Sequence, residues 1–154
     1  MFLFLKNPFL YLVYKHNFSL RKKDLSLPKV YLSNLGFAKR GETNKDLGKK
    51  MENAVFLELE RRKSAQGSLS YWKNVQQEEV DFVVKNGADI ECLIQVCADL
   101  NADTKKREWR ALLKAARELK PKKLLCITEN YASIEKVKGK KVHCIPLLEW
   151  LQEK

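Results

Sequence analysis

Apolar residues recur with a helical period between residues 45 and 62. Five of them fall on one side of a helix with 3.6 residues per turn: Leu47, Met51, Val55, Phe56 and Leu59. Thr43 or Asn44 could cap its start, and Gln66-Gly67 ends it. The pattern predicts an amphipathic helix with one face packed on a core.

Three strand-like segments follow this helix, at about residues 68–73, 79–85 and 89–96. They are rich in aromatic and β-branched residues, which favour extended structure. The last two are separated by Asn86-Gly87, a dipeptide typical of hairpin turns. The pattern predicts an antiparallel hairpin with Asp81 in its first strand.

The last third of the chain alternates helical and strand patterns. Residues 103–119 have a helical period, with Asp103 as N-cap or first-turn acid. Residues 122–128 form a continuous apolar run of the buried parallel-strand type. A short strand at 142–145 and a short helix at 147–152 complete the series.

This order of elements predicts an α/β domain, a mixed central sheet flanked by helices, in which the strand–helix–strand crossover is right-handed. We expect the domain to cover residues 41–154, after an apolar and basic N-terminal extension at 1–40 with short strands near 9–14 and 29–32. The opening run MFLFLKNPFLYLV contains polar residues and is too short to span a membrane. We expect this run to form a buried strand or the end of a helix. We also expect either that a domain boundary lies upstream of it or that the chain is a fragment of a larger protein.

The net charge of +11 is unevenly distributed over the 154 residues. The first fifty residues hold eleven Lys and Arg against three acids, Asp24, Glu42 and Asp46. A basic face attracts a polyanion such as DNA through counterion release and steering. A solvated basic surface, or one that covers another domain of a longer protein, explains the charge equally well.

Four cysteines lie in or beside strand-like runs: Cys92, Cys97, Cys126 and Cys144. None has Cys-x-x-Cys spacing, and no histidine is placed to complete a zinc set. The pattern predicts buried free thiols in a reducing cytoplasm.

The hairpin also carries the candidate chemistry. Asp81 lies in an apolar strand, and the neighbouring strand ends in Gln95-Val96-Cys97, so residues 95 and 97 share a face. Glu52 lies near the edge of the apolar stripe of the first helix. Glu52, Asp81 and the Gln95 amide could bind Mg²⁺ weakly, since that ion prefers oxygen ligands. Each also has a structural interpretation, as a solvated or paired acid or a buried polar group.

A phosphodiesterase site of this type also needs a cation near the metal. Cys97 cannot supply one. Lys73, on the first strand of the trio, could substitute, as could Lys105, Lys106 or Arg107 at the start of the second helix. A solvated first turn is the simpler interpretation of the last three.

Several segments together resemble one prokaryotic family, the C-terminal DUF4143-type domain of predicted archaeal and bacterial AAA+ ATPases. They are ENAVFLEL within 51–59, Tyr71-Trp72, EVDFV at 79–83, LIQVC at 93–97, Arg107-Glu108 with Ala111-Leu112-Leu113, and KVYLSNLG at 29–36. The last departs from the family's KVYxxDxGL at Ser33-Asn34. The family is sometimes described as Holliday-junction-resolvase-like, and the resemblance covers about residues 10–150.

The resemblance implies a PD-(D/E)XK, restriction-endonuclease-like core of αβββαβ order. It implies that Glu52, Asp81 and Gln95 match the nuclease metal positions and that Cys97 matches the catalytic lysine. It also implies an N-terminal ATPase domain or ATPase partner. This chain contains no G-x-x-x-x-G-K-[ST] run, so we expect no nucleotide site in it.

Three functional hypotheses follow. The first is a nuclease-fold domain that binds DNA, with Mg²⁺-dependent cleavage weak or lost because Cys97 replaces the lysine. The second is a non-catalytic interaction or regulatory module of a larger AAA+ ATPase. The third is an active Mg²⁺-dependent endonuclease with a relocated lysine. Fold analogy alone cannot choose among them.

Overall fold

The computed structural model describes residues 9–16, 26–34, 36 and 44–153. Its elements in chain order are β1 (Leu10–Val13), β2 (Lys29–Leu32), α1 (Asn44–Arg62), β3 (Gly67–Lys73), β4 (Glu79–Asn86), β5 (Asp89–Cys97), α2 (Ala102–Leu119), β6 (Lys123–Thr128), β7 (Ser133–Val137), β8 (Lys140–Pro146) and α3 (Leu147–Gln152). Among the described helices, none is long and apolar enough to cross a membrane.

A six-stranded sheet with the order β3-β4-β5-β6-β8-β7 forms the centre of the fold. β3, β4 and β5 are antiparallel, whereas β5, β6 and β8 are parallel neighbours, with α2 as the crossover from β5 to β6. This confirms the predicted α/β class and the mixed sheet flanked by helices. The division into an extension at 1–40 and a domain at 41–154 stays a prediction.

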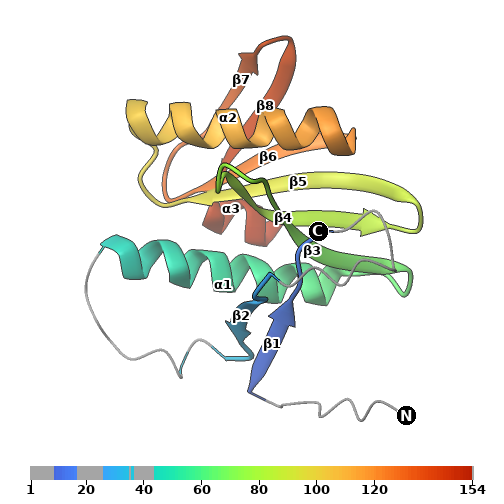
Figure 1. Ribbon diagram of the computed structural model, residues 1–154. Helices are drawn as coiled ribbons and strands as arrows, with labels where there is room; N and C mark the ends of the chain where they lie inside the picture. The colour runs from blue at the N-terminus through green and yellow to red at the C-terminus, as the bar shows by residue number, and fades with distance from the viewer. Residues whose placement is uncertain (1–8, 17–25, 35, 37–43, 154) are drawn as a thin grey trace.

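Helices lie on both faces of this sheet, α2 on one and α1 on the other (Figure 1). Under α2, the core contains Val83, Leu93, Leu112 and Cys126 among others. The second core lies on the α1 face and includes residues of the β1–β2 ribbon as well as of α1. As predicted, the four cysteines are free thiols, three of them buried.

The structure corrects three details of the sequence interpretation. β7, at residues 133–137, was not predicted, because its alternating SIEKV sequence carries little apolar signal. The N-cap of α2 is Asn101, whose side chain accepts from two backbone N–H groups, and Asp103 is a first-turn acid. The hairpin turn falls one residue later than predicted, at residues 87–88, because Gly87 supplies the positive φ angle.

The β1–β2 ribbon is attached to α1 by one amide side chain. Asn53 accepts from the Leu32 backbone N–H at 2.7 Å and donates to the Leu32 carbonyl at 2.9 Å. Beside it, the Tyr31 and Phe56 rings stack with their centroids 4.4 Å apart. The edge strand β2 thereby gains a fixed register against the helix.

We expect Asn53→Ala to lower the free energy of unfolding by about 2 kcal/mol, because it leaves two buried backbone groups of Leu32 without partners. Urea unfolding would measure this loss. Lys49→Ala, at an exposed position of the same helix, is the matched control and should change stability by less than about 0.5 kcal/mol. Equal effects of the two substitutions would contradict the role assigned to Asn53.

Candidate functional site

A β-bulge in β4 sets the direction of Asp81. The β3–β4 register changes between the pairs Ser70↔Val83 and Trp72↔Val80, so that Tyr71 faces two residues, Asp81 and Phe82. Val80 and Val83 both pack in the core under α2, whereas Phe82 packs in the core on the α1 face. The extra residue turns Asp81 toward α1 as well, where it meets a side chain from β2.

That side chain is Lys29, whose ammonium lies among three carboxylates. Its Nζ is 2.8 Å from Asp81 Oδ1, 2.9 Å from Glu52 Oε1 and 2.7 Å from Glu79 Oε1. The Lys29 side chain is 18% exposed and that of Asp81 10%, so solvent screens these contacts weakly. We call Lys29, Glu52, Glu79 and Asp81 the Lys29 cluster.

Two further hydrogen bonds fix the carboxylates of this cluster. The Tyr31 hydroxyl donates to Glu52 Oε1 at 2.6 Å, and the Val96 backbone N–H donates to Asp81 Oδ2 at 2.9 Å. Lys29 and Tyr31 are alternate residues of β2 and reach toward the same helix, as the period of a strand requires. Both oxygens of Asp81 therefore have donors.

The charges shift each other's protonation. Burial alone lowers the pKa of Lys29, but the Asp81 and Glu52 carboxylates outweigh it and raise that pKa above its ordinary value. Burial raises the pKa of Asp81 to about 7, against the lowering effect of the Lys29 ammonium, and the Glu52 carboxylate adds to the rise. Asp81 thus retains its proton at a pH where an exposed aspartate is ionised.

The structure places the other two predicted residues, Gln95 and Cys97, on the opposite face of the sheet. Gln95 donates through Nε2 to Glu108 Oε2 of α2 at 2.6 Å, and its own Oε1 is buried without a hydrogen-bond partner. The Cys97 thiol donates to the Asp99 carbonyl at 3.2 Å. Burial and the nearby Glu108 raise the pKa of Cys97 to about 11, so this thiol is neutral.

Of the four cations considered as substitutes for the missing lysine, Lys106 is exposed on α2, and the other three form ion pairs. Lys73 lies 3.3 Å from Glu79, at the edge of the Lys29 cluster. Lys105 pairs with Glu135 of β7, and Arg107 pairs with Glu108. Sequence reasoning missed Lys29, which lies far from both acids along the chain. Its only signal was the alternation of Lys29 and Tyr31 in a strand, which shows a shared face but not what that face meets.

These residues do not fit a Mg²⁺ ion. The Lys29 ammonium lies where a cation would contact the three carboxylates, and Gln95 is on the other side of the sheet. Across the described residues, no three acidic, His or Cys side chains are arranged to hold a metal ion. As it stands, the cluster can hold a proton and fix β2 against α1 and β4.

The pKa of Asp81 predicts a pH dependence. The folded protein keeps its proton up to about pH 7, whereas an unfolded aspartate loses it near pH 4. The folded state binds more protons in between, so the contribution of Asp81 to stability falls as the pH rises through this window. We expect the free energy of unfolding of wild type minus that of Asp81→Asn to fall from about pH 4.5 to about pH 8.

Urea unfolding at each pH would measure this difference, in which the titration of groups remote from the Lys29 cluster cancels. Asp89→Asn, at an exposed acid paired with Lys122, is the control and should give a much flatter difference. A wild-type stability that rises relative to Asp81→Asn over the same range would overturn the assignment.

Comparison with known proteins places this fold in a family. The family model described as "Domain of unknown function (DUF4143)" matches residues 47–150, from α1 to α3. Uncharacterized protein MJ1544 of Methanocaldococcus jannaschii is 34% identical over 141 residues, which are 88% of this chain and 32% of that protein. The chain thus spans about a third of the length of this curated relative. No solved structure matches the chain significantly. Because the family model covers most of the chain, including Glu52, Asp81, Gln95 and Cys97, the protein belongs to the DUF4143 family.

Proposed function

We propose that this chain is a non-catalytic binding domain that acts as part of a longer protein, on a nuclease-like fold without phosphodiester cleavage. The position of the Lys29 ammonium carries this proposal. It neutralises the two carboxylates that a nuclease would use for its metal, at 2.9 Å from Glu52 and 2.8 Å from Asp81. A cluster closed in this way attaches the β1–β2 ribbon and leaves no open coordination position.

The separation of the four predicted residues supports the same proposal. Metal-dependent hydrolysis requires the metal ligands and a cation to meet around one phosphate. Here Glu52, on α1, and Asp81 meet Lys29 on the α1 face of the sheet, whereas Gln95 and Cys97 lie on the α2 face. The two pairs therefore cannot act on a common substrate atom. The sheet itself lies between the two pairs.

The longer protein is proposed from the relative and from the family resemblance. This chain matches only a third of the archaeal protein, so such a domain can occur beside others. The family resemblance makes an AAA+ ATPase the proposed neighbour. A P-loop run is not found in this chain, so ATP binding would belong to that neighbour.

We expect no metal-dependent cleavage when the purified domain is incubated with labelled duplex, single-stranded or four-way-junction DNA and Mg²⁺ or Mn²⁺. Gel electrophoresis of the products, with EDTA and Asp81→Ala reactions alongside, measures this. Cleavage that requires metal and disappears in Asp81→Ala, with the fold intact by circular dichroism, would refute the proposal. The Lys29→Ala variant should also be inactive. Removing the Lys29 ammonium does not bring Gln95 and Cys97 to the face of the sheet that carries Glu52 and Asp81.

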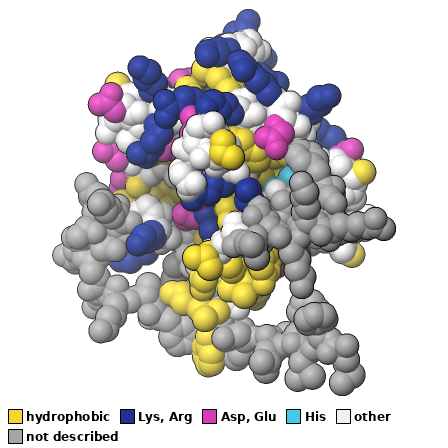
Figure 2. Space-filling view, in the orientation of Figure 1, with side chains coloured by type: hydrophobic (Ala, Val, Ile, Leu, Met, Phe, Trp, Pro, Cys, Tyr) yellow, Lys and Arg dark blue, Asp and Glu magenta, His cyan; other side chains and the backbone are white. Residues whose placement is uncertain are grey.

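A second candidate function is DNA contact by the opposite part of the molecule. Residues 102–146 hold thirteen Lys and Arg against five Asp and Glu. Lys and Arg side chains gather on the upper part of Figure 2, over α2 and the β7–β8 hairpin. A basic surface of this kind favours nucleic acid by releasing its counterions. It carries no base specificity by itself.

If this surface contacts DNA, then Lys106→Gln with Lys138→Gln should weaken binding to duplex DNA uniformly across sequences. Both side chains are exposed, on α2 and on the β7–β8 turn respectively. The slope of log K against log[salt] should become shallower by about 0.9 for each phosphate that the variant no longer neutralises. Fluorescence anisotropy over a salt series measures it. Lys49→Gln, at an exposed position of α1, is the control, and an equal weakening there would contradict this location.

A further inference from the structure

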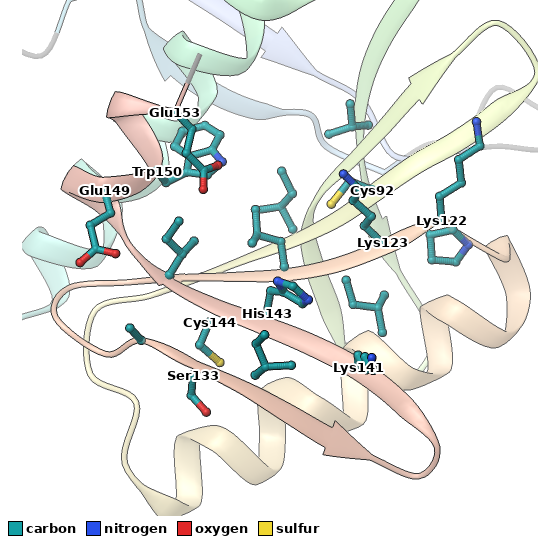
Figure 3. A pocket seen from close by; sticks show the side chains of 18 of the residues that line it. Cys92, Lys122, Lys123, Ser133, Lys141, His143, Cys144, Glu149, Trp150 and Glu153 are labelled. Atoms are coloured by element: carbon teal, nitrogen blue, oxygen red, sulfur yellow. The ribbon is translucent and has the colours of Figure 1, made fainter.

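A groove of about 1090 Å³ lies on the α1 face of the sheet, beyond the end of α1. Strands β6 and β8 form its floor, with α3 at one end and Lys122 and Lys123 at the other (Figure 3). It is separate from the Lys29 cluster, since none of the four cluster residues lines it. Nothing in the proposed function uses it.

The floor of this groove is a row of side chains across the sheet. The register pairs Ile94 with Leu125, Leu125 with His143, and His143 with Ile134, so these four residues cross β5, β6, β8 and β7 in one line. Ile134 is 65% exposed. His143 lies near the middle of the groove in Figure 3. Ile94 is buried and His143 is polar, so the open apolar surface of this row is that of Ile134 and the half-buried Leu125.

Beside the apolar row lies a basic edge. Lys123 is paired with Cys92 across the β5–β6 ladder, and Lys140 and Lys141 begin β8. Unlike Lys122, which pairs with Asp89 and Glu91, these three lysines form no ion pair with an acid in the described part of the chain. The α3 end carries the opposite charge.

Two carboxylates, Glu149 and Glu153, line the α3 end of the groove. Arg62 closes this end, because its guanidinium lies 4.5 Å from the Trp150 ring centroid and donates to the Trp150 carbonyl at 2.8 Å. The groove therefore has an apolar floor, a basic end at β6 and β8, and an acidic end at α3.

The position on a sheet face restricts the occupant. Strands of a sheet bond to their neighbours in the plane, so an extended peptide could pair only with an edge such as β7, not with this floor. A polypeptide that covers the floor must satisfy its own backbone, as a helix does. On the opposite face, α2 covers the sheet with eighteen residues. On this face, α1 packs over β5, and the six-residue α3 covers only one end of the groove over β6 and β8.

We propose that this groove binds an amphipathic helix of a partner protein, with acidic side chains beside its apolar stripe. The stripe would pack on Leu125, Ile145 and Ile134, and the acidic residues would meet Lys123, Lys140 and Lys141. At the β6–β8 end, where these lysines have no acidic partner among the described residues, charge complementarity selects acidic over basic residues for the part of the helix that lies there. The inference deepens the proposed binding function, for which it names the partner's chemistry, and it rests on that function.

A fluorescein-labelled peptide of about 18 residues, long enough for five helical turns, tests this directly. Its Leu residues follow i, i+3, i+4, i+7 spacing, Glu flanks the stripe and Ala fills the rest. Two control peptides replace every Glu by Lys, or every Leu by Ser. Fluorescence anisotropy with the whole chain should show saturable binding of the Leu–Glu peptide, with at least about tenfold weaker binding of either control.

Two protein variants locate the site. Lys123→Glu with Lys141→Glu should weaken binding of the Leu–Glu peptide by about tenfold or more, and Ile134→Ser should weaken it by about threefold. Lys106→Glu with Arg117→Glu, at two exposed positions of α2, is the control of equal charge change and should change it less than about twofold. Circular dichroism and thermal unfolding verify that each variant folds.

Three results of the peptide measurements would overturn the inference: no saturable binding, equal binding of the Ser peptide, or an equal weakening in the variant with Lys106→Glu and Arg117→Glu. Competition by an unlabelled oligonucleotide at equimolar concentration would assign the groove to nucleic acid instead and would also overturn it. The nuclease assay is independent of these measurements. If the domain cleaves DNA and also binds the peptide, only the non-catalytic proposal is refuted. If it neither cleaves DNA nor binds the peptide, only the inference about the groove is refuted.

Discussion

The Lys29 ammonium and its three carboxylates impose the constraint on which the α1 face of this fold depends. Lys29 comes from β2, Glu52 from α1, and Glu79 and Asp81 from β4, so one charge joins three elements that are distant in sequence. Removing it would leave several acids close together with little solvent, which costs about 3–5 kcal/mol for a buried pair. Residues Val13 and Tyr31 of the β1–β2 ribbon accordingly pack in the core on the α1 face.

A single extra residue in β4 decides which face receives the acid. Without the bulge opposite Tyr71, strict alternation would place Asp81 on the same face as Val83, under α2 and beside Gln95. The alternation of side chains along a strand predicts that Asp81 and Gln95 share a face, because nothing in the composition of β4 signals a bulge. Bulges concentrate next to functional sites, where they redirect a side chain. In this protein the redirected carboxylate meets a lysine.

Local patterns were sufficient to predict most of the elements, because α1, α2 and β3 to β6 each bury an apolar face with a clear period. β7 was not predicted, because an edge strand with alternating charged residues buries little apolar surface. The acids Glu52 and Asp81 could be predicted as neighbours from the fold resemblance. Their partner Lys29 could not, because the docking of a separate two-stranded ribbon depends on Asn53 and on the stacking of Tyr31, which are tertiary contacts.

A buried ionic cluster is a poor source of stability, since desolvation of four charged groups offsets much of their attraction. Its benefit is orientation: an apolar contact between β2 and α1 could slide, whereas an ammonium among three carboxylates has one position. The same face carries the open groove at β6 and β8, and α1 lies between the two. A ribbon held rigidly on one side of α1 fixes the helix whose last turn, through Arg62 and Trp150, forms the wall of that groove. On the proposed function, the carboxylates that the family resemblance assigns to a metal instead support the proposed binding groove.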